Sequence, residues 1–149
     1  MKRLYVIIFS AILFASLLSC GDDSELMSKV FINQPDLTWG APMDAIESKM
    51  QKFELIDSDA QNLYYAGGGM EHAISYYFVD GKLDASLVTV SADKVSLEAL
   101  ESLLKTYTHL GEYSGANVYC KESTNTLAVI SKKKINGNDW LYIGYSRIE

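Results

Sequence analysis

Apolar residues recur at helical spacing in two stretches of the chain, which predicts two short amphipathic helices. The first helix is expected from Met43 to about Lys52, directly after Pro42, which suits a first helical turn. The second is expected after Ser96, a favourable N-cap residue. The buried stripe of the second helix should consist of Leu97, Leu100, Leu104 and Tyr107. Each helix would therefore lay one apolar face on the rest of the domain.

Runs rich in β-branched and aromatic residues predict strands between and after these helices. Two long hairpins are expected, because Asp80-Gly81 and Asn136-Gly137 favour the positive φ angles of two-residue turns. The predicted strands cover residues 53–56, 63–66, 73–79, 83–90, 117–120, 126–135 and 139–147. Each half of the chain then consists of a helix, short strands and a long hairpin.

The two hairpin turns fix which residues face each other across the strands. In the first hairpin the expected helix-facing pairs are Phe78–Leu83, Tyr76–Ala85 and Ile74–Leu87. In the second hairpin the expected helix-facing pairs are Lys132–Leu141, Ile130–Ile143 and Ala128–Tyr145. Because successive side chains point to opposite faces of a strand, these pairs assign both faces of each hairpin.

The face turned away from the helices is unexpectedly apolar in the second hairpin, although a solvent-facing sheet surface normally carries polar residues. The candidate partner-binding residues on this face are Tyr77, Leu127, Val129, Trp140 and Tyr142. Exposed together, they would form the kind of apolar patch that marks an interaction site. Two alternatives remain: the N-terminal tether, a loop or a second copy covers the face, or a bulge exchanges the faces and sends Trp140 inward.

The two halves match each other when the sequence is shifted by 54 residues, and by 56 residues for the two turns. Two helix–antiparallel-hairpin repeats predict an α+β fold, with one sheet and the helices packed on one face. The expected domain covers residues 37–149, divided into repeats at about 39–92 and 93–149. This layout resembles tandem-repeat folds such as β-lactamase inhibitor proteins and small lipoproteins of outer-membrane assembly. Trp39-Gly40 before a helix also resembles the opening of many small envelope lipoproteins.

The N-terminus has the organisation of a secretory signal. Lys2-Arg3 precedes an apolar run over residues 4–18, and the segment ends in Leu17-Leu18-Ser19-Cys20. This ending resembles the lipobox of bacterial lipoproteins. The resemblance implies that residues 1–19 are removed, that the Cys20 sulfur receives a diacylglyceryl group, and that the new amine is acylated. A transmembrane anchor is the alternative, but fifteen residues are fewer than the ~20 that a spanning helix needs.

Residues 20–36 are expected to form a flexible tether between the lipid and the domain. Asp22-Asp23 after the cysteine resembles the acidic export tag of some surface-exposed lipoproteins. The expected location is therefore the cell envelope, on the periplasmic face or the cell surface, with the membrane reached through the lipid on Cys20.

The chain that remains after cleavage is acidic. It would hold 11 lysines and arginines against 19 acidic residues, a net charge of −8, because the signal contains two basic residues and no acidic ones. Nucleic-acid binding is therefore not expected, since its affinity comes largely from neutralised phosphates. With Cys20 lipidated, Cys120 has no partner for an intrachain disulfide.

No residue cluster in the sequence predicts catalysis, a metal site or a cofactor. His72 and His109 are the only histidines, and no spacing supplies the three or four converging ligands of a metal centre. Cys120 is expected to be a small buried strand residue. Gly67-Gly68-Gly69 is expected to be a mobile connection or a place where another backbone comes close. The Lys132-Lys133-Lys134 run is expected to protect strand ends from edge pairing.

These observations favour a lipid-anchored, non-enzymatic envelope protein that binds a protein partner, as an inhibitor or an assembly factor, through its sheet. A glycan- or small-ligand-binding lipoprotein is the alternative, because aromatic platforms also suit sugars. An enzyme of unrecognised type ranks third. A flat apolar patch would favour the first function, and a concave pocket with converging polar groups the second.

Overall fold

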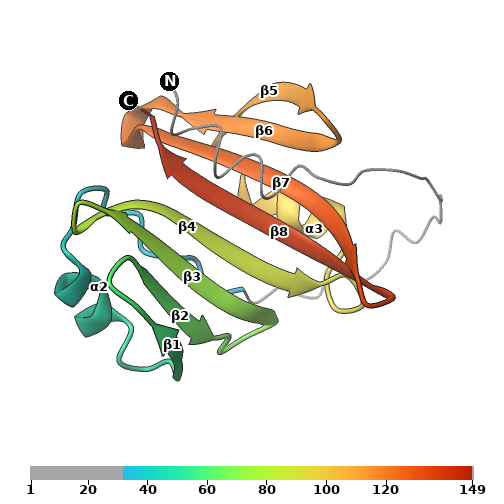
Figure 1. The fold of residues 1–149 in the computed structure, drawn as a ribbon. Helices are drawn as coiled ribbons and strands as arrows, with labels where there is room; N and C mark the ends of the chain where they lie inside the picture. The colour runs from blue at the N-terminus through green and yellow to red at the C-terminus, as the bar shows by residue number, and fades with distance from the viewer. Residues whose placement is uncertain (1–31, 149) are drawn as a thin grey trace.

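The computed structural model describes residues 32–148 and places them in one eight-stranded antiparallel sheet (Figure 1). The strand order is β1-β2-β3-β4-β8-β7-β6-β5, so β4 and β8 meet in the middle. The strands are β1 (Leu55–Ser58), β2 (Asn62–Ala66), β3 (Glu71–Val79), β4 (Lys82–Ser91), β5 (Thr108–Tyr113), β6 (Ala116–Lys121), β7 (Thr126–Ile135) and β8 (Asn138–Arg147).

The predicted α+β class is wrong, because the fold is mostly antiparallel β-sheet. The two helices, α2 (Met43–Lys49) and α3 (Leu97–Leu103), have seven residues each, and a three-residue 3-10 turn (Glu122–Thr124) adds little. The helical spacing of apolar residues continues past both helix ends, but the chain leaves the helix after Met50 and Leu104. Two helices of two turns each cannot form the helical layer that was expected.

The two halves of the chain have the same order of elements, a helix followed by four strands. The helices begin at Met43 and Leu97, which are 54 residues apart. Strand order is also mirrored about the β4–β8 junction. The division of the domain into two repeats stays a prediction, because a shared order of elements does not establish that the halves superpose.

Strand β5, which contains His109, was not predicted. Leu110 is 58% exposed and Tyr113 66% exposed, so this edge strand has neither a buried face nor the alternating pattern that reveals a strand. Gly111, at φ +124°, accompanies a bulge between His109 and Gly111 in the pairing with β6. A bulge on an edge strand locally disrupts pairing and limits attachment of further strands.

The register of the second hairpin is confirmed. Strands β7 and β8 pair Lys132 with Leu141, and the two further predicted pairs are also present. Asn136 and Gly137 have φ angles of +50° and +83°, as the two-residue turn requires. Local turn chemistry and unbroken alternation of side chains therefore define this hairpin.

The register of the first hairpin was predicted correctly only next to its turn. Phe78 pairs with Leu83, but a bulge then shifts the pairing by one residue, so that Tyr76 faces Ser86 and Ile74 faces Val88. The extra residue at the bulge is Asp84, whose carboxylate lies 3.5 Å from Arg147. As a result Leu87 lies on the opposite face from the predicted one.

The hydrophobic core lies on one face of the sheet, called here the core face. Side chains of α2 and of strands β2, β3 and β4 form one cluster, which includes Ile46 and Tyr76. Side chains of α3 and of strands β4, β6, β7 and β8 form a second cluster, which includes Leu100 and Ile143. Ser96 caps α3 by accepting a hydrogen bond from the Ala99 amide, as its position predicted.

Residues 32–38 lie against the core face, so the domain begins earlier than the predicted boundary at residue 37. Ile32 is 8% exposed and belongs to the second core cluster. The Gln34 side chain accepts a hydrogen bond from Tyr145 Oη at 2.8 Å, and the Asp36 amide donates to Tyr76 Oη at 3.0 Å. This segment is called the strap, because it binds buried tyrosines from both halves of the sheet.

Glu71 holds the strap and the triglycine loop together. Its side chain is 3% exposed and accepts hydrogen bonds from the Asn33 amide at 3.1 Å and from the Gly68 and Gly69 amides at 2.9 and 3.0 Å. A Cβ atom on Gly67 would lie 1.9 Å from the Glu71 carbonyl oxygen. The triglycine run is therefore a place of close backbone approach, the second of the two predicted roles.

Candidate functional site: the outer face of the sheet

The face opposite the core, called here the outer face, carries all five predicted partner-binding residues. Leu127 and Val129 alternate along β7 with buried core residues, and Trp140 and Tyr142 do the same along β8. Tyr77 lies between the core residues Tyr76 and Phe78 on β3 and also points outward. All five side chains are half-buried. Trp140 therefore does not turn into the core. An inward Trp140 was the outcome that would have excluded this residue from the candidate site.

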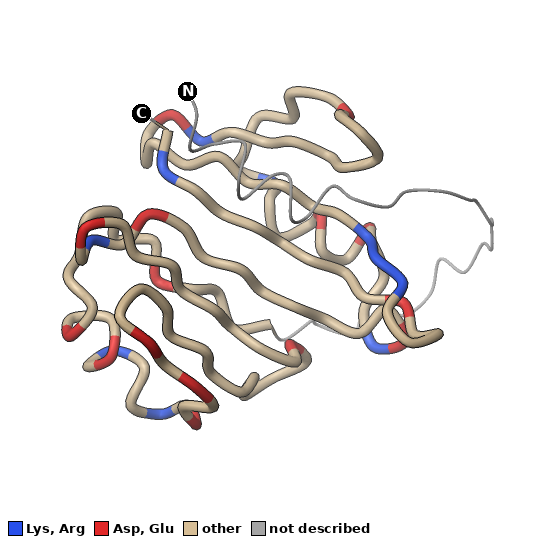
Figure 2. Tube along the Cα trace, in the orientation of Figure 1, with Lys and Arg blue, Asp and Glu red and all other residues tan. Residues whose placement is uncertain are grey.

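The outer face extends beyond the predicted residues and is largely uncharged. Leu87 points outward because of the bulge in the first hairpin, opposite Gly144. Further half-buried residues on the same face are Tyr64, Val118 and Cys120. Figure 2 shows few charges along the middle of the central strands, with a basic run near the end of β7. Within residues 32–148, both helices and the strap pack on the core face and leave this face open.

The tyrosines of the outer face are neutral hydrogen-bonding groups at physiological pH. Tyr64 and Tyr77 make an edge-to-face contact with ring centroids 6.3 Å apart. Burial raises the pKa of Tyr77, and the nearby Tyr64 raises it further. Burial also raises the pKa of Tyr142. These side chains combine apolar area with a hydroxyl group, a combination that is frequent in interface cores.

A cleft of about 300 Å³ lies at one end of the outer face. Its walls come from β3, β4, the end of β7, the β7–β8 turn and the start of β8. The lining residues are His72, Thr89, Ile135, Asn136, Asn138, Trp140 and Tyr142. The His72 and Trp140 rings contact each other with centroids 4.9 Å apart. Sequence reasoning identified two of these residues as site candidates but had no signal for the cleft, because its walls come from separate parts of the chain.

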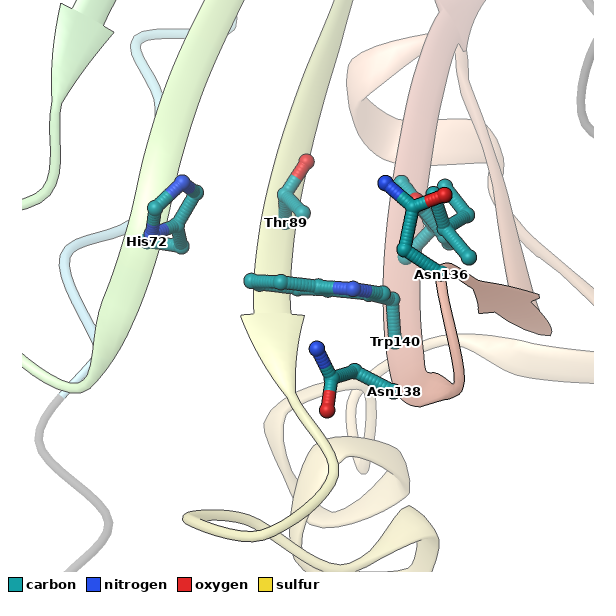
Figure 3. Close-up of a pocket in the computed structure, with 7 residues that line it drawn as sticks. His72, Thr89, Asn136, Asn138 and Trp140 are labelled. Atoms are coloured by element: carbon teal, nitrogen blue, oxygen red, sulfur yellow. The ribbon is translucent and has the colours of Figure 1, made fainter.

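Figure 3 shows how the cleft side chains are arranged around Trp140. The indole ring extends from β8 across β4 towards His72 on β3. His72, Thr89 and Asn136 lie on one side of the ring plane, and Asn138 lies on the other. One face of the indole is therefore bordered by three polar side chains.

The residues considered for catalysis lie apart in the sheet. His109 and Cys120 are on the adjacent strands β5 and β6, but His109 pairs with Tyr119, so it lies on the core-face side while Cys120 points outward. Cys120 is half-buried rather than buried. His72 is on β3, and three strands separate β3 from β6. Among residues 32–148, no three His, Cys, Asp or Glu side chains come together.

The lysine run at the end of β7 is divided between the two faces. Lys132 forms an ion pair with Asp139 at 2.7 Å, and this pairing lowers the pKa of the Asp139 carboxyl group. Lys133 faces Trp140 across the hairpin and therefore points outward beside the cleft. Lys134 is the register partner of Asp139 across the turn.

The described part of the chain contains no helix long and apolar enough to cross a bilayer. The predicted lipobox, which ends at Cys20, lies outside the described residues and stays a prediction. Comparisons with protein families, with curated proteins and with solved structures find no match to this chain. The case for function therefore depends on the residues of the outer face.

Proposed function

We propose that this chain is a lipid-anchored, non-enzymatic protein of the cell envelope that binds a protein partner through the outer face of its sheet. One observation carries the proposal: an apolar, largely uncharged sheet face is left uncovered by every described element. Soluble monomers rarely leave large contiguous apolar patches in contact with water. The aromatic residues Tyr77, Trp140 and Tyr142 add the residue types that interface cores favour.

Site-specific photo-crosslinking in the native cell tests this proposal. A photoreactive residue at Val129, on the outer face, should give an adduct of one defined mass. The same residue at Ile56, which is 61% exposed on the edge strand β1, is the control and should give none. Equal labelling at both positions, or no adduct at Val129, would contradict the proposal. An adduct of twice the mass of the chain would assign the face to self-association instead.

Trp140→Ala separates a binding role from a folding role. The variant should abolish the Val129 adduct while unfolding at nearly the wild-type denaturant concentration, because Trp140 is only half-buried. A core tryptophan would cost about 3–5 kcal/mol on the same truncation. A loss of that size for Trp140→Ala would mean that the side chain supports the fold.

Lipid attachment is tested separately. Mass spectrometry of the mature N-terminus should find acyl chains on Cys20, and Cys20→Ala should release the protein from the membrane. Cys120→Ala is the matched control and should leave both results unchanged. An unmodified thiol at Cys20 in membrane-extracted protein would contradict the proposed anchor.

A further inference from the structure

The cleft beside Trp140 is shaped by an irregularity in β3. Glu71 pairs with Val90 and Ala73 with Thr89, so a bulge leaves His72 without a pairing partner on β4. Glu71 can then point into the core while His72 remains exposed and contacts the Trp140 ring. Bulges of this kind re-aim side chains and occur preferentially next to functional sites.

The composition of the cleft restricts the ligands that suit it. None of its seven lining residues is Asp, Glu, Lys or Arg, and Lys133 lies beside the cleft rather than in its lining, so the lining itself favours a neutral ligand over a phosphate or carboxylate. Thr89 and Asn136 each supply a hydrogen-bond donor and an acceptor. Trp140 supplies a flat apolar surface with a negative π face, which attracts the C–H groups of a ligand. A suitable ligand therefore has an apolar ring face surrounded by hydroxyl groups.

We propose that this cleft binds one neutral pyranose ring of a saccharide, stacked on Trp140. The ring lies on the side of the indole plane that faces His72, Thr89 and Asn136, where polar groups surround the aromatic surface (Figure 3). His72 contacts the indole at the edge of this surface. The saccharide site is a function beyond partner binding, and it needs no protein partner.

The size of the cleft sets the expected affinity. At about 300 Å³ it is at the small end of the range for ligand sites, which is about 300–1,000 Å³. One ring can fill it, whereas a longer glycan would extend over the neighbouring outer face. A single ring held by one aromatic surface and a few hydrogen bonds should bind in the millimolar range.

Nuclear magnetic resonance of the two tryptophan indole N–H groups tests the site directly. Glucose, galactose and N-acetylglucosamine are titrated into the full chain in detergent. The Trp140 signal should shift and saturate with at least one of these sugars. The Trp39 signal is an internal control, because its indole N–H donates to Thr126 Oγ1 at 3.0 Å, and Trp39 packs against the core clusters. Glycerol, which has hydroxyl groups but no ring face, should leave both signals in place.

A glycine substitution in the turn removes one wall of the cleft without disturbing the backbone. Asn136 has φ +50°, which glycine adopts without strain, so Asn136→Gly deletes the amide group alone. The variant should weaken sugar binding about three- to tenfold, the effect of one lost hydrogen bond. Asp80→Gly makes the same change at φ +51° in the other hairpin and should leave binding unchanged.

Three results would overturn the saccharide site. They are no saturable shift of the Trp140 signal with any sugar, an equal shift with glycerol, or equal affinities for Asn136→Gly and the wild type. The partner-binding proposal is judged by crosslinking at Val129 and not by sugar binding, so the two proposals can fail independently.

Discussion

Replacing the buried carboxylate of Glu71 with an amide should destabilise the domain by about 2–4 kcal/mol. The carboxylate accepts one hydrogen bond on Oε2 and three on Oε1, from Asn33, Gly68 and Gly69. In Glu71→Gln an amide NH₂ group must replace one oxygen. If the remaining oxygen takes the Oε1 position, the NH₂ group faces the Asn33 amide, and one buried donor loses its acceptor.

The magnitude follows from these contacts. Hydrogen bonds to a charged group contribute about 1 kcal/mol more than neutral ones, and an unsatisfied buried donor costs about 1–3 kcal/mol. Easier burial of the neutral amide offsets part of this loss. Glu101→Gln is the matched control, because both hydrogen bonds of Glu101, from Asn117 and Tyr119, end on one oxygen that glutamine keeps. Its cost should stay below about 1 kcal/mol.

The contribution of Glu71 to the stability of the fold should also depend on pH. Burial raises the pKa of the Glu71 carboxyl, but hydrogen bonds from Asn33 and Gly68 outweigh it and hold the pKa below its ordinary value of 4.5. The stabilisation is therefore complete above the unfolded-state pKa and is lost as the pH falls through the folded-state value. The difference in the free energy of unfolding between the wild type and Glu71→Gln should be largest at neutral pH and should shrink below pH 4.5.

Equilibrium urea unfolding, followed by tryptophan fluorescence at several pH values, measures this gap. Equal midpoints for Glu71→Gln and the wild type at neutral pH would refute the reasoning. So would a gap that stays constant below pH 4.5, because the lost interaction would then not depend on the charge of Glu71.

Four further substitutions are tested by the same unfolding measurement. Leu100→Ala should cost about 2–5 kcal/mol because Leu100 is fully buried. Leu97 was wrongly predicted to belong to the same buried stripe and is 38% exposed, so Leu97→Ala should cost less than about 1 kcal/mol. Equal losses would contradict the assigned face of α3. Ser86→Ala should leave stability unchanged or raise it slightly, because the buried Ser86 hydroxyl has no hydrogen-bond partner among the described residues; a clear loss would indicate an unseen partner. Gly67→Ala should cost about 1–3 kcal/mol through its clash with the Glu71 carbonyl, and a wild-type midpoint would exclude that clash.

Local sequence determined the second hairpin and, through it, most of the candidate site. The Asn136-Gly137 turn sets the register, and strict alternation then assigns Val129 and Trp140 to the face opposite Ile130 and Leu141. Such predictions succeed because turn conformation and side-chain alternation depend on neighbouring residues only. The helix starts after Pro42 and at Ser96 were predictable for the same reason.

Tertiary structure decided the features that join distant segments. The helices end at Lys49 and Leu103, and the residues after them form turns that lead into the edge strands β1 and β5, which local spacing does not reveal. The bulge at Asp84 and the strap on Glu71 depend on partners in other strands. The cleft requires His72 on β3, Thr89 on β4 and Trp140 on β8, which come together only because β4 and β8 are neighbours in the sheet. The pairing of β4 with β8 joins residues some 50 positions apart in the sequence, such as Thr89 and Tyr142. Packing of the whole sheet determines this pairing.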